Sequence, residues 1–149
     1  METIDDFMRK RIEIIGAAES VQRAALKMKD KNVSSLLVND KDDKPIGLIT
    51  ERDLARKVCI QDVYTSKITT KEIMSSPLIT IRSGSSQSEA IDAMFQNNVR
   101  HLLVVDSNKT PDDKDKPIGM ITPLDFTKSQ GYAGSDNNDT IEKLLEYFI

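Results

Sequence analysis

The stretch that decides the fold is Lys44-Pro45-Ile46-Gly47-Leu48-Ile49-Thr50-Glu51-Arg52-Asp53, which reappears as Lys116-Pro117-Ile118-Gly119-Met120-Ile121-Thr122-Pro123-Leu124-Asp125. Seven of these ten residues are identical, at an offset of 72. A preceding stretch, NVSSLLV at residues 32–38, returns as NVRHLLV at residues 98–104, with five identities in seven at an offset of 66. Two copies in the same order predict a tandem repeat of one small unit.

Working outward, the periodicity of apolar residues predicts the same elements in both copies. We expect short strands over 12–15 and 78–81, each followed by a helix. The helical stripes are Val21, Ala24, Ala25 and Met28 in the first copy, and Ala90, Ile91, Met94 and Phe95 in the second. Apolar strands follow over 36–38 and 46–49, and over 102–105 and 118–121, before a last helix that begins at Glu51 or Pro123.

The sequence thus predicts a mixed α/β (α+β) fold of two β-α-β-β-α repeats. Each repeat opens on a short turn, Asp6-Phe7-Met8 or Glu72-Ile73-Met74. A unit of roughly 55 residues is too small to bury a sheet alone, so we expect the two copies to pack on each other. The polar stretch 106–115 holds the extra residues of the second copy and is expected to be a solvated turn.

These elements suggest four segments along the chain. The first repeat is expected over 3–60, a connector over 61–69, the second repeat over 70–130, and a linker with a C-terminal amphipathic helix over 131–149. The apolar stripe of that last helix is Ile141, Leu144, Leu145, Phe148 and Ile149. A short helix is marginal in isolation, so we expect this stripe to dock on its own sheet or on a second subunit.

Composition narrows the classes of function. The formal net charge of -3 is spread over mixed acids and bases, which argues against a nucleic-acid partner. The chain contains neither a long apolar run nor a signal-like start, so we expect a cytoplasmic protein without a membrane partner. Cys59 is the only cysteine and His101 the only histidine, which excludes intrachain disulfides and every metal site that needs two such ligands.

The repeated pattern Gly-apolar-Ile-Thr-x-x-Asp resembles the signature of cystathionine-β-synthase (CBS) domains. Together with the Asn-Val-x-x-Leu-Leu-Val strand and the Ile73-Met74-Ser75 opening, it makes residues 3–130 similar to a CBS-domain pair, or Bateman module, here expected to stand alone. The resemblance implies pseudo-twofold packing and two clefts for an adenosine-containing ligand such as AMP, ADP, ATP or S-adenosylmethionine. In the family, the Asp holds the ribose hydroxyls and the Thr or Ser contacts phosphate.

Elementary chemistry is compatible with those implied roles. A carboxylate accepts hydrogen bonds from two adjacent hydroxyls, and a Thr between strand and helix lies beside free backbone N–H groups that favour phosphate. Gly47 and Gly119 leave room for the close approach of a ligand or of another backbone.

Carried over residue by residue, the resemblance implies two unequal clefts. One combines Thr122, Asp125 and Met120 with Val33, Ser34 and Ser35, and the other combines Thr50, Asp53 and Leu48 with Ser75, Ile79, Val99, Arg100 and His101. Arg100 and His101 occupy the positions that Ser34 and Ser35 hold in the first copy, so one cleft gains a cation for phosphate. Ser75 is matched by Arg9 in the first copy.

Other interpretations remain open. Each Thr-x-x-Asp is also a helix-capping box, and a lone histidine at a strand start is often packed or solvated. A Cys59–His101 nucleophile–base pair would need an orienting third group, for which the sequence offers no candidate, so we expect no catalytic residues and no enzyme. The expected function is therefore regulatory sensing of an adenosyl ligand by a homodimer. One alternative is a structural or protein-interaction module with empty clefts, and another is a nucleic-acid binder. An effector protein is a possible further partner, and the sequence does not identify it.

Overall fold

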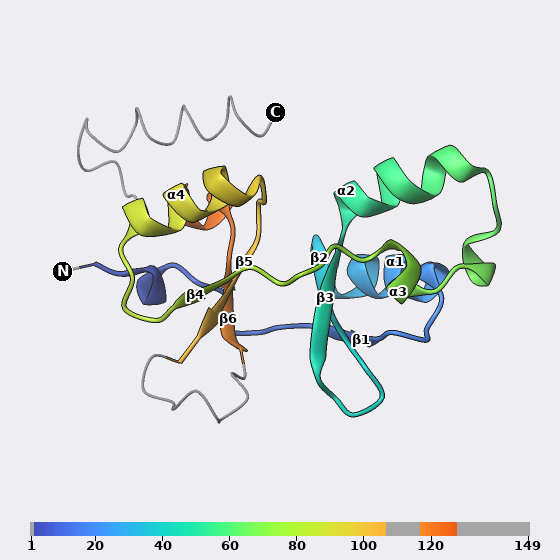
Figure 1. Ribbon diagram of the computed structural model, residues 1–149, viewed down its shortest axis with the longest axis horizontal. Coiled ribbons are helices and arrows are strands. Elements are labelled where there is room, and N and C mark those ends of the chain that lie inside the picture. Colours follow the sequence, from blue (N-terminus) through green and yellow to red (C-terminus); the bar gives the residue numbers. More distant parts are fainter. Residues whose placement is uncertain (1, 107–116, 128–149) are drawn as a thin grey trace. The chain divides into compact units, whose positions relative to one another are not determined.

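The structure, a computed structural model, describes residues 2–106 and 117–127 (Figure 1). It divides into two compact units. One consists of Ile12–Leu78 and is called the Asp53 unit below. The other combines Met1–Arg11 with Ile79–Ile149 and is called the Asp125 unit. Each unit therefore contains the opening turn of one sequence repeat and the strands of the other.

The Asp53 unit is built on a three-stranded sheet in the order β1 (Ile14–Gly16), β2 (Ser35–Asn39), β3 (Pro45–Thr50). β1 runs parallel to β2, and β2 pairs with β3 in an antiparallel register that places Ser35 opposite Thr50. Helix α1 (Val21–Lys31) connects the two parallel strands, as such a crossover requires. The remaining helical elements are α2 (Glu51–Asp53), the π-helical turn η2 (Leu54–Val58), η3 (Cys59–Gln61), η4 (Thr65–Lys67) and α3 (Thr70–Ile73).

One face of this sheet carries the core of the unit. Val21, Ala24 and Met28 of α1 pack against Leu36, Val38 and Ile49, with Val58, Ile68 and Ile73 from the later helical segments. Side chains alternate along a strand, so Leu37 and Leu48, both buried, project from the opposite face. Thr50 lies two residues after Leu48 and shares that second face.

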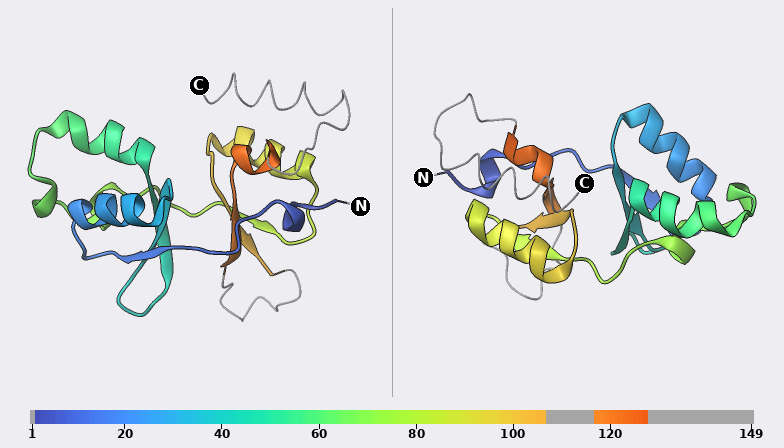
Figure 2. Two further views of the ribbon diagram at one scale, coloured as in Figure 1. Left: turned by 180° about the vertical axis from the view of Figure 1, so that it is seen from behind. Right: turned by 90° about the horizontal axis from the view of Figure 1, so that it is seen from above.

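The Asp125 unit repeats this plan. Its sheet has the order β4 (Thr80–Arg82), β5 (Leu102–Val105), β6 (Pro117–Ile121), with α4 (Gln87–Asn97) connecting the parallel pair. Ala90 and Met94 of α4 lie in its core with strand residues and with Ile4 and Phe7 of the N-terminal segment, where the short helix η1 (Ile4–Asp6) lies. The Phe7 ring meets Phe126 of η5 (Pro123–Thr127) edge to face at 5.8 Å. Figure 2 shows each unit's helices beside its own sheet from two further sides.

The sequence predicted these elements closely, with two side chains placed wrongly. The two long helices, the four apolar strands and the Ser86–Glu89 capping box are confirmed. Ala25 and Phe95, expected in the helical stripes, are exposed instead, Phe95 by 37%. Each helix contacts a single sheet, so a narrower stripe is buried than the sequence pattern suggests. The expected C-terminal stripe from Ile141 lies outside the described residues, as does most of the 106–115 turn.

The opening segments, Ile4–Arg9 and Thr70–Ser75, pair with the last strand of each unit. Ser75 forms an antiparallel bridge with Leu48, and Arg9 forms one with Met120. A Cβ atom on Gly47 would lie 2.4 Å from the Met74 sulfur, and one on Gly119 would lie 2.5 Å from the Met8 sulfur. The repeated glycine therefore admits the methionine of the opening segment, in accordance with the close approach that the sequence suggested.

No helix among residues 2–106 and 117–127 has the length and apolar character needed to cross a membrane.

We predict that Gly47→Ala destabilises the protein. Its Cβ would overlap Met74 and lie 3.1 Å from the Ser75 carbonyl oxygen, so the methionine must turn out of its place, and overpacking of this kind costs about 1 to 3 kcal/mol. Gly16→Ala is the matched control, because its Cβ would meet only Glu19 Cγ at an ordinary 3.5 Å. Urea unfolding followed by circular dichroism measures both variants. Equal stability of the two would contradict this role for Gly47.

Candidate ligand-binding site

The Thr50–Asp53 pair lies where β3 turns into α2. Thr50 is the residue before the helix, and its hydroxyl accepts a hydrogen bond from the Asp53 backbone N–H at 3.1 Å. In return, Asp53 Oδ2 accepts from the Thr50 N–H at 3.0 Å and from the Thr50 hydroxyl at 3.1 Å. This is the capping box that the sequence predicted as the alternative to a ligand site, and it commits one oxygen of the carboxylate.

The other oxygen of Asp53 faces two donors from beyond the capping box. Oδ1 accepts from the Ser75 hydroxyl at 2.9 Å and lies 3.1 Å from Lys57 Nζ. Lys57 also donates to the Ile73 carbonyl at 3.1 Å. Asp53 is only 5% exposed, so these partners replace the hydrogen bonds that water would otherwise donate, and Lys57 balances the charge of the carboxylate. The backbone bridge between Ser75 and Leu48 places the serine in position.

Several predicted site residues of the Asp53 unit share one sheet face. Ser35 is directly opposite Thr50, and Leu48 and Ser75 are paired, so all four project from the face away from α1. Ser34 lies immediately before β2, where its carbonyl accepts from the Glu51 N–H at 3.1 Å. Val33 is half-buried against the core at the end of α1. The structure therefore brings together Leu48, Thr50, Asp53 and Ser75 as one group with Ser35 beside them.

The Asp125 unit has the same arrangement with a different donor. Asp125 Oδ2 accepts from the Thr122 N–H at 2.8 Å and from its hydroxyl at 3.1 Å. Oδ1 accepts from Arg9 Nε at 3.1 Å in an ion pair, with the Asp125 side chain 0% exposed and the Arg9 side chain 42% exposed. Met120 lies beside Arg9 through the strand bridge. The Asp125 carboxylate thus contacts its threonine as the Asp53 carboxylate does, while the Asp125 N–H donates to the Thr122 carbonyl at 3.1 Å.

The remaining predicted residues belong to the Asp125 unit. Arg100 and His101 are half-buried directly before β5, Val99 packs on the core at the end of α4, and the Ile79 carbonyl accepts from the Leu103 N–H at 3.1 Å. By the repeat alignment, His101, directly before β5, corresponds to Ser35, the first residue of β2. Their assignment to the cleft of Asp53 would join residues of the two units and stays a prediction.

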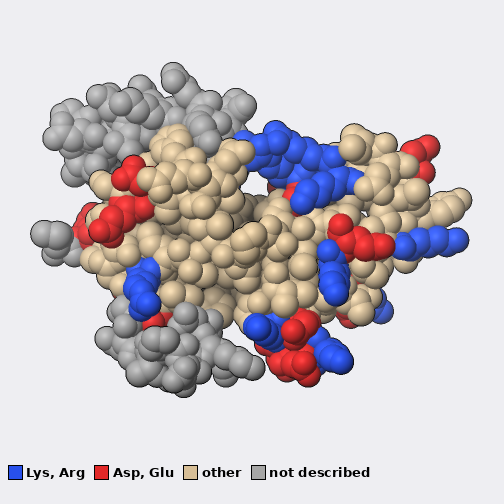
Figure 3. All heavy atoms as spheres, viewed as in Figure 1, with Lys and Arg blue, Asp and Glu red and all other residues tan. Residues whose placement is uncertain are grey.

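Sequence reasoning missed Lys57 and the partner of Arg9. Lys57 follows Asp53 by four residues, a spacing at which opposite charges meet on a helix, so this contact could have been found. Lys57 belongs to a basic stretch with Arg52 and Arg56, and Figure 3 shows Lys and Arg side chains gathered over α2. The Arg9–Asp125 pair spans 116 residues, and no local pattern indicates it.

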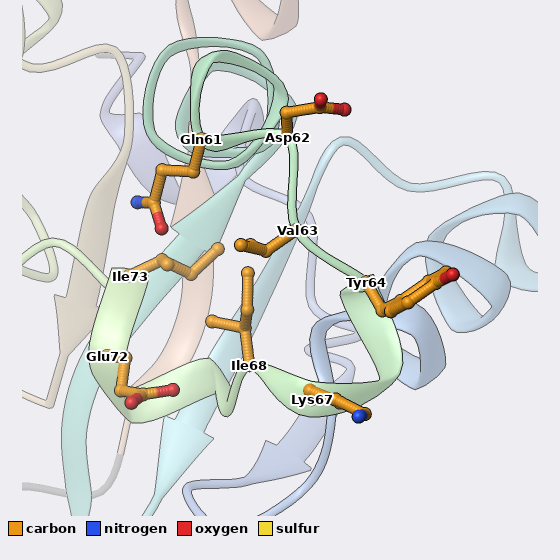
Figure 4. Close-up of a pocket in the computed structure, with 8 residues that line it drawn as sticks. All are labelled: Gln61, Asp62, Val63, Tyr64, Lys67, Ile68, Glu72 and Ile73. Atoms are coloured by element: carbon orange, nitrogen blue, oxygen red, sulfur yellow. The ribbon is translucent and has the colours of Figure 1, made fainter.

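A separate pocket of about 800 Å³ lies elsewhere in the Asp53 unit (Figure 4). Val63, Ile68 and Ile73 form its apolar part, and its other lining residues are Gln61, Asp62, Tyr64, Lys67 and Glu72. None of the predicted site residues lines it. We place the candidate site at the Thr–Asp motif because two independent copies converge there on the same geometry, whereas volume alone says nothing of chemistry.

Two observations bear on the chemistry of the described residues. Cys59 is exposed at the start of the short turn η3. Within 2–106 and 117–127, no group of three His, Cys, Asp or Glu side chains could hold a metal ion.

The family follows from a match along both repeats. The model of the CBS domain matches residues 4–59 and again residues 71–131. The chain belongs to the CBS-domain family. The resemblance drawn from the motif is confirmed, and so is the mixed α+β fold of tandem CBS repeats.

Two curated relatives differ in how much of their own length the chain matches. An uncharacterised protein of Methanopyrus kandleri is 28% identical over 144 residues, which are 97% of this chain and 70% of that protein. An inosine-5'-monophosphate dehydrogenase of Methanocaldococcus jannaschii is 30% identical over 128 residues, which are 86% of this chain but only 23% of the enzyme. The chain thus spans about a quarter of the length of that dehydrogenase.

Solved CBS structures share the fold. A CBS-domain protein of unknown function from Thermoplasma acidophilum superposes with a TM-score of 0.81 at 17% identity, covering 99% of this chain and 76% of that one. A CBS protein from Pyrobaculum aerophilum complexed with AMP gives 0.72 at 17% identity, over 95% of this chain and 99% of that one. The CBS pair of protein MJ0100, in complex with 5-methylthioadenosine and S-adenosyl-L-methionine, gives 0.69 at 24% identity, over 85% and 97%.

We predict that Thr50→Ala lowers the free energy of unfolding by about 1 kcal/mol, the usual cost of losing an N-cap hydroxyl. Thr50→Ser keeps the oxygen that accepts from the Asp53 N–H and should retain most of the stability. Urea unfolding compares the three proteins. If serine is as destabilising as alanine, the methyl group of Thr50, and not the cap, is what the fold requires.

Proposed function

We propose that this CBS pair is a regulatory module that binds an adenine nucleotide or S-adenosylmethionine through its Thr-x-x-Asp motifs. The observation that carries the proposal is the hydroxyl of Ser75 on Asp53 Oδ1 at 2.9 Å. A buried carboxylate that already accepts a hydroxyl at this oxygen can accept ribose hydroxyls in the same way. Two solved relatives of the same fold hold AMP, or methylthioadenosine with S-adenosylmethionine, which supports the ligand class.

The surroundings of Asp53 suit the other parts of such a ligand. Leu48 is buried on the same sheet face as Thr50 and offers an apolar contact for a base. The hydroxyl of Thr50 stands at the start of a helical segment, and Arg52, Arg56 and Lys57 give that segment a positive charge. Cations beside a helix start favour phosphate oxygens. We therefore assign the ribose to Asp53 and the phosphate end to this basic side.

A second function is favoured by the hydrogen bonding of the acid itself. Asp53 accepts three hydrogen bonds from Thr50 and Ser75 and forms an ion pair with Lys57, which together use about the capacity of a carboxylate. A motif so fully used within the protein suits a structural or protein-interaction module whose clefts stay empty. A thermal-shift panel of AMP, ADP, ATP and S-adenosylmethionine separates the two, because a ligand that binds the folded state raises its stability.

We predict that Asp53→Ala weakens binding of the ligand found in that panel, and that Asp125→Ala weakens any binding at its own motif. A lost hydrogen bond to a charged acceptor costs about 1.5 to 3 kcal/mol, or roughly ten- to a hundredfold in affinity. Asp30→Ala is the control, since Asp30 is an exposed acid of α1. Calorimetric titration measures the affinities. Wild-type affinity in both motif variants would leave capping as the whole role of these acids.

We also propose Arg100 as a phosphate contact, because it replaces a serine of the first copy with a planar cation. Arg100→Ala should reduce affinity more for ATP than for AMP, and least for adenosine, since only the phosphates carry charge for the guanidinium. Arg82→Ala, an exposed arginine of the same unit, is the matched control. The measurement is calorimetry at low and raised salt. An equal loss for all three ligands would show that Arg100 acts on the fold.

A further inference from the structure

The two motif acids differ in the side chain that reaches them from the opening segment. Ser75 donates to Asp53 Oδ1 at 2.9 Å, and Arg9 donates to Asp125 Oδ1 at 3.1 Å. Both donors occupy the same place, because Ser75 is bridged to Leu48 and Arg9 to Met120 in equivalent strands. A single position of the repeat thus supplies a neutral hydroxyl in one unit and a guanidinium in the other.

This position faces the carboxylate oxygen that a ribose would use. In both units Oδ2 is held by the backbone and hydroxyl of the preceding threonine, at 2.8 to 3.1 Å. Ribose hydroxyls must therefore bind at Oδ1, beside or in place of Ser75 or Arg9. What already occupies Oδ1 decides how readily each acid accepts a ligand.

At Asp53, ligand binding would exchange one hydroxyl for another on Oδ1. A ribose hydroxyl can replace the Ser75 hydroxyl, which stands on an exposed residue and can turn to water. Lys57 donates to the Ile73 carbonyl at 3.1 Å as well as to the Ser75 hydroxyl at 3.4 Å, so the Ile73 contact can keep its positive charge beside the carboxylate when the serine turns away. The acid keeps its ion pair and about the same number of hydrogen bonds.

At Asp125 the same exchange would separate an ion pair whose acid is fully buried, while its arginine side chain is 42% exposed. The Asp125 side chain is 0% exposed, and Arg9 Nε lies 3.1 Å from its Oδ1. A neutral hydroxyl in place of the guanidinium would remove the positive charge that contacts this buried carboxylate, which is unfavourable. The Arg9 backbone is also fixed, by hydrogen bonds of 2.8 and 2.9 Å with Met120, so the side chain starts beside the acid.

We infer that Arg9 closes the Asp125 motif to adenosyl ligands, so that each chain takes one such ligand, at Asp53. The inference rests on the proposed function and adds to it which of the two motifs is the working site. Arg9 is then a specificity-determining residue: it selects against occupation of the second motif, while Ser75 permits occupation of the first.

A reciprocal exchange of the two side chains tests this inference. AMP, ADP, ATP and S-adenosylmethionine are each titrated calorimetrically into the full chain, with thermal unfolding to verify folding. The wild type should bind one equivalent per chain, and Asp53→Ala should remove that binding. Arg9→Ser should bind a second equivalent, and Ser75→Arg should weaken the first at least tenfold. Lys10→Ser, the loss of an adjacent exposed cation, should still bind one equivalent.

The outcomes distinguish the inference from the proposed function. Two equivalents in the wild type, or a single equivalent in Arg9→Ser, would overturn the role of Arg9 and leave ligand binding in place. Absence of binding for all four ligands in both the wild type and Arg9→Ser would overturn the proposed function itself. Arg9→Gln, which removes the charge and keeps a side chain of similar size, should also gain the second equivalent and serves if the serine variant is unstable.

Discussion

The contact between the methionine of each opening segment and the glycine of each last strand is the constraint on which the candidate site depends. Met74 lies where a Cβ of Gly47 would be, and Met8 lies where a Cβ of Gly119 would be. This close approach allows the next residue, Ser75 or Arg9, to pair with the strand through its backbone. The side chain of that residue then reaches Oδ1 of the motif acid. Without a glycine, the strand would hold the opening segment away from the acid.

A second constraint is that the two oxygens of each motif carboxylate have different partners. Oδ2 is committed to the helix start, where it satisfies the threonine N–H, while Oδ1 faces the opening segment. The capping and the ligand-binding interpretations of the motif are therefore compatible, because they use different oxygens of one side chain. Capping also fixes the carboxylate in one orientation, which lowers the entropy that a ligand must remove on binding. The same argument applies to both units, since their motif geometry is alike.

The electrostatic environments of the two acids are set by different parts of the chain. Lys57 comes from the helical segment that follows Asp53, whereas Arg9 comes from the opening segment and contacts Asp125. Both acids thus have a cation 3.1 Å from Oδ1. At Asp53, Oδ1 also accepts from the hydroxyl of Ser75, the residue that corresponds to Arg9 in the other repeat. A buried carboxylate tolerates exchange of a neutral donor far better than loss of a charged one. One substitution between the repeats is enough to make two similar motifs unequal.

The sequence by itself determined the repeat, the order of strands and helices, and the capping of each helix start. These features are local: apolar spacing sets the helix of Val21 and Met28, and Thr50 reaches Asp53 over only three residues. It also showed Arg9 at the position of Ser75, but not what either side chain contacts. Only the tertiary structure decided that Arg9 meets Asp125, 116 residues away, and that the first opening segment joins the strands of the second repeat. The physical reason is that this pairing depends on the packing of a whole unit, in which Met8 lies against Gly119 and Phe7 against Phe126. Local patterns of residues do not indicate contacts between segments so far apart in the sequence.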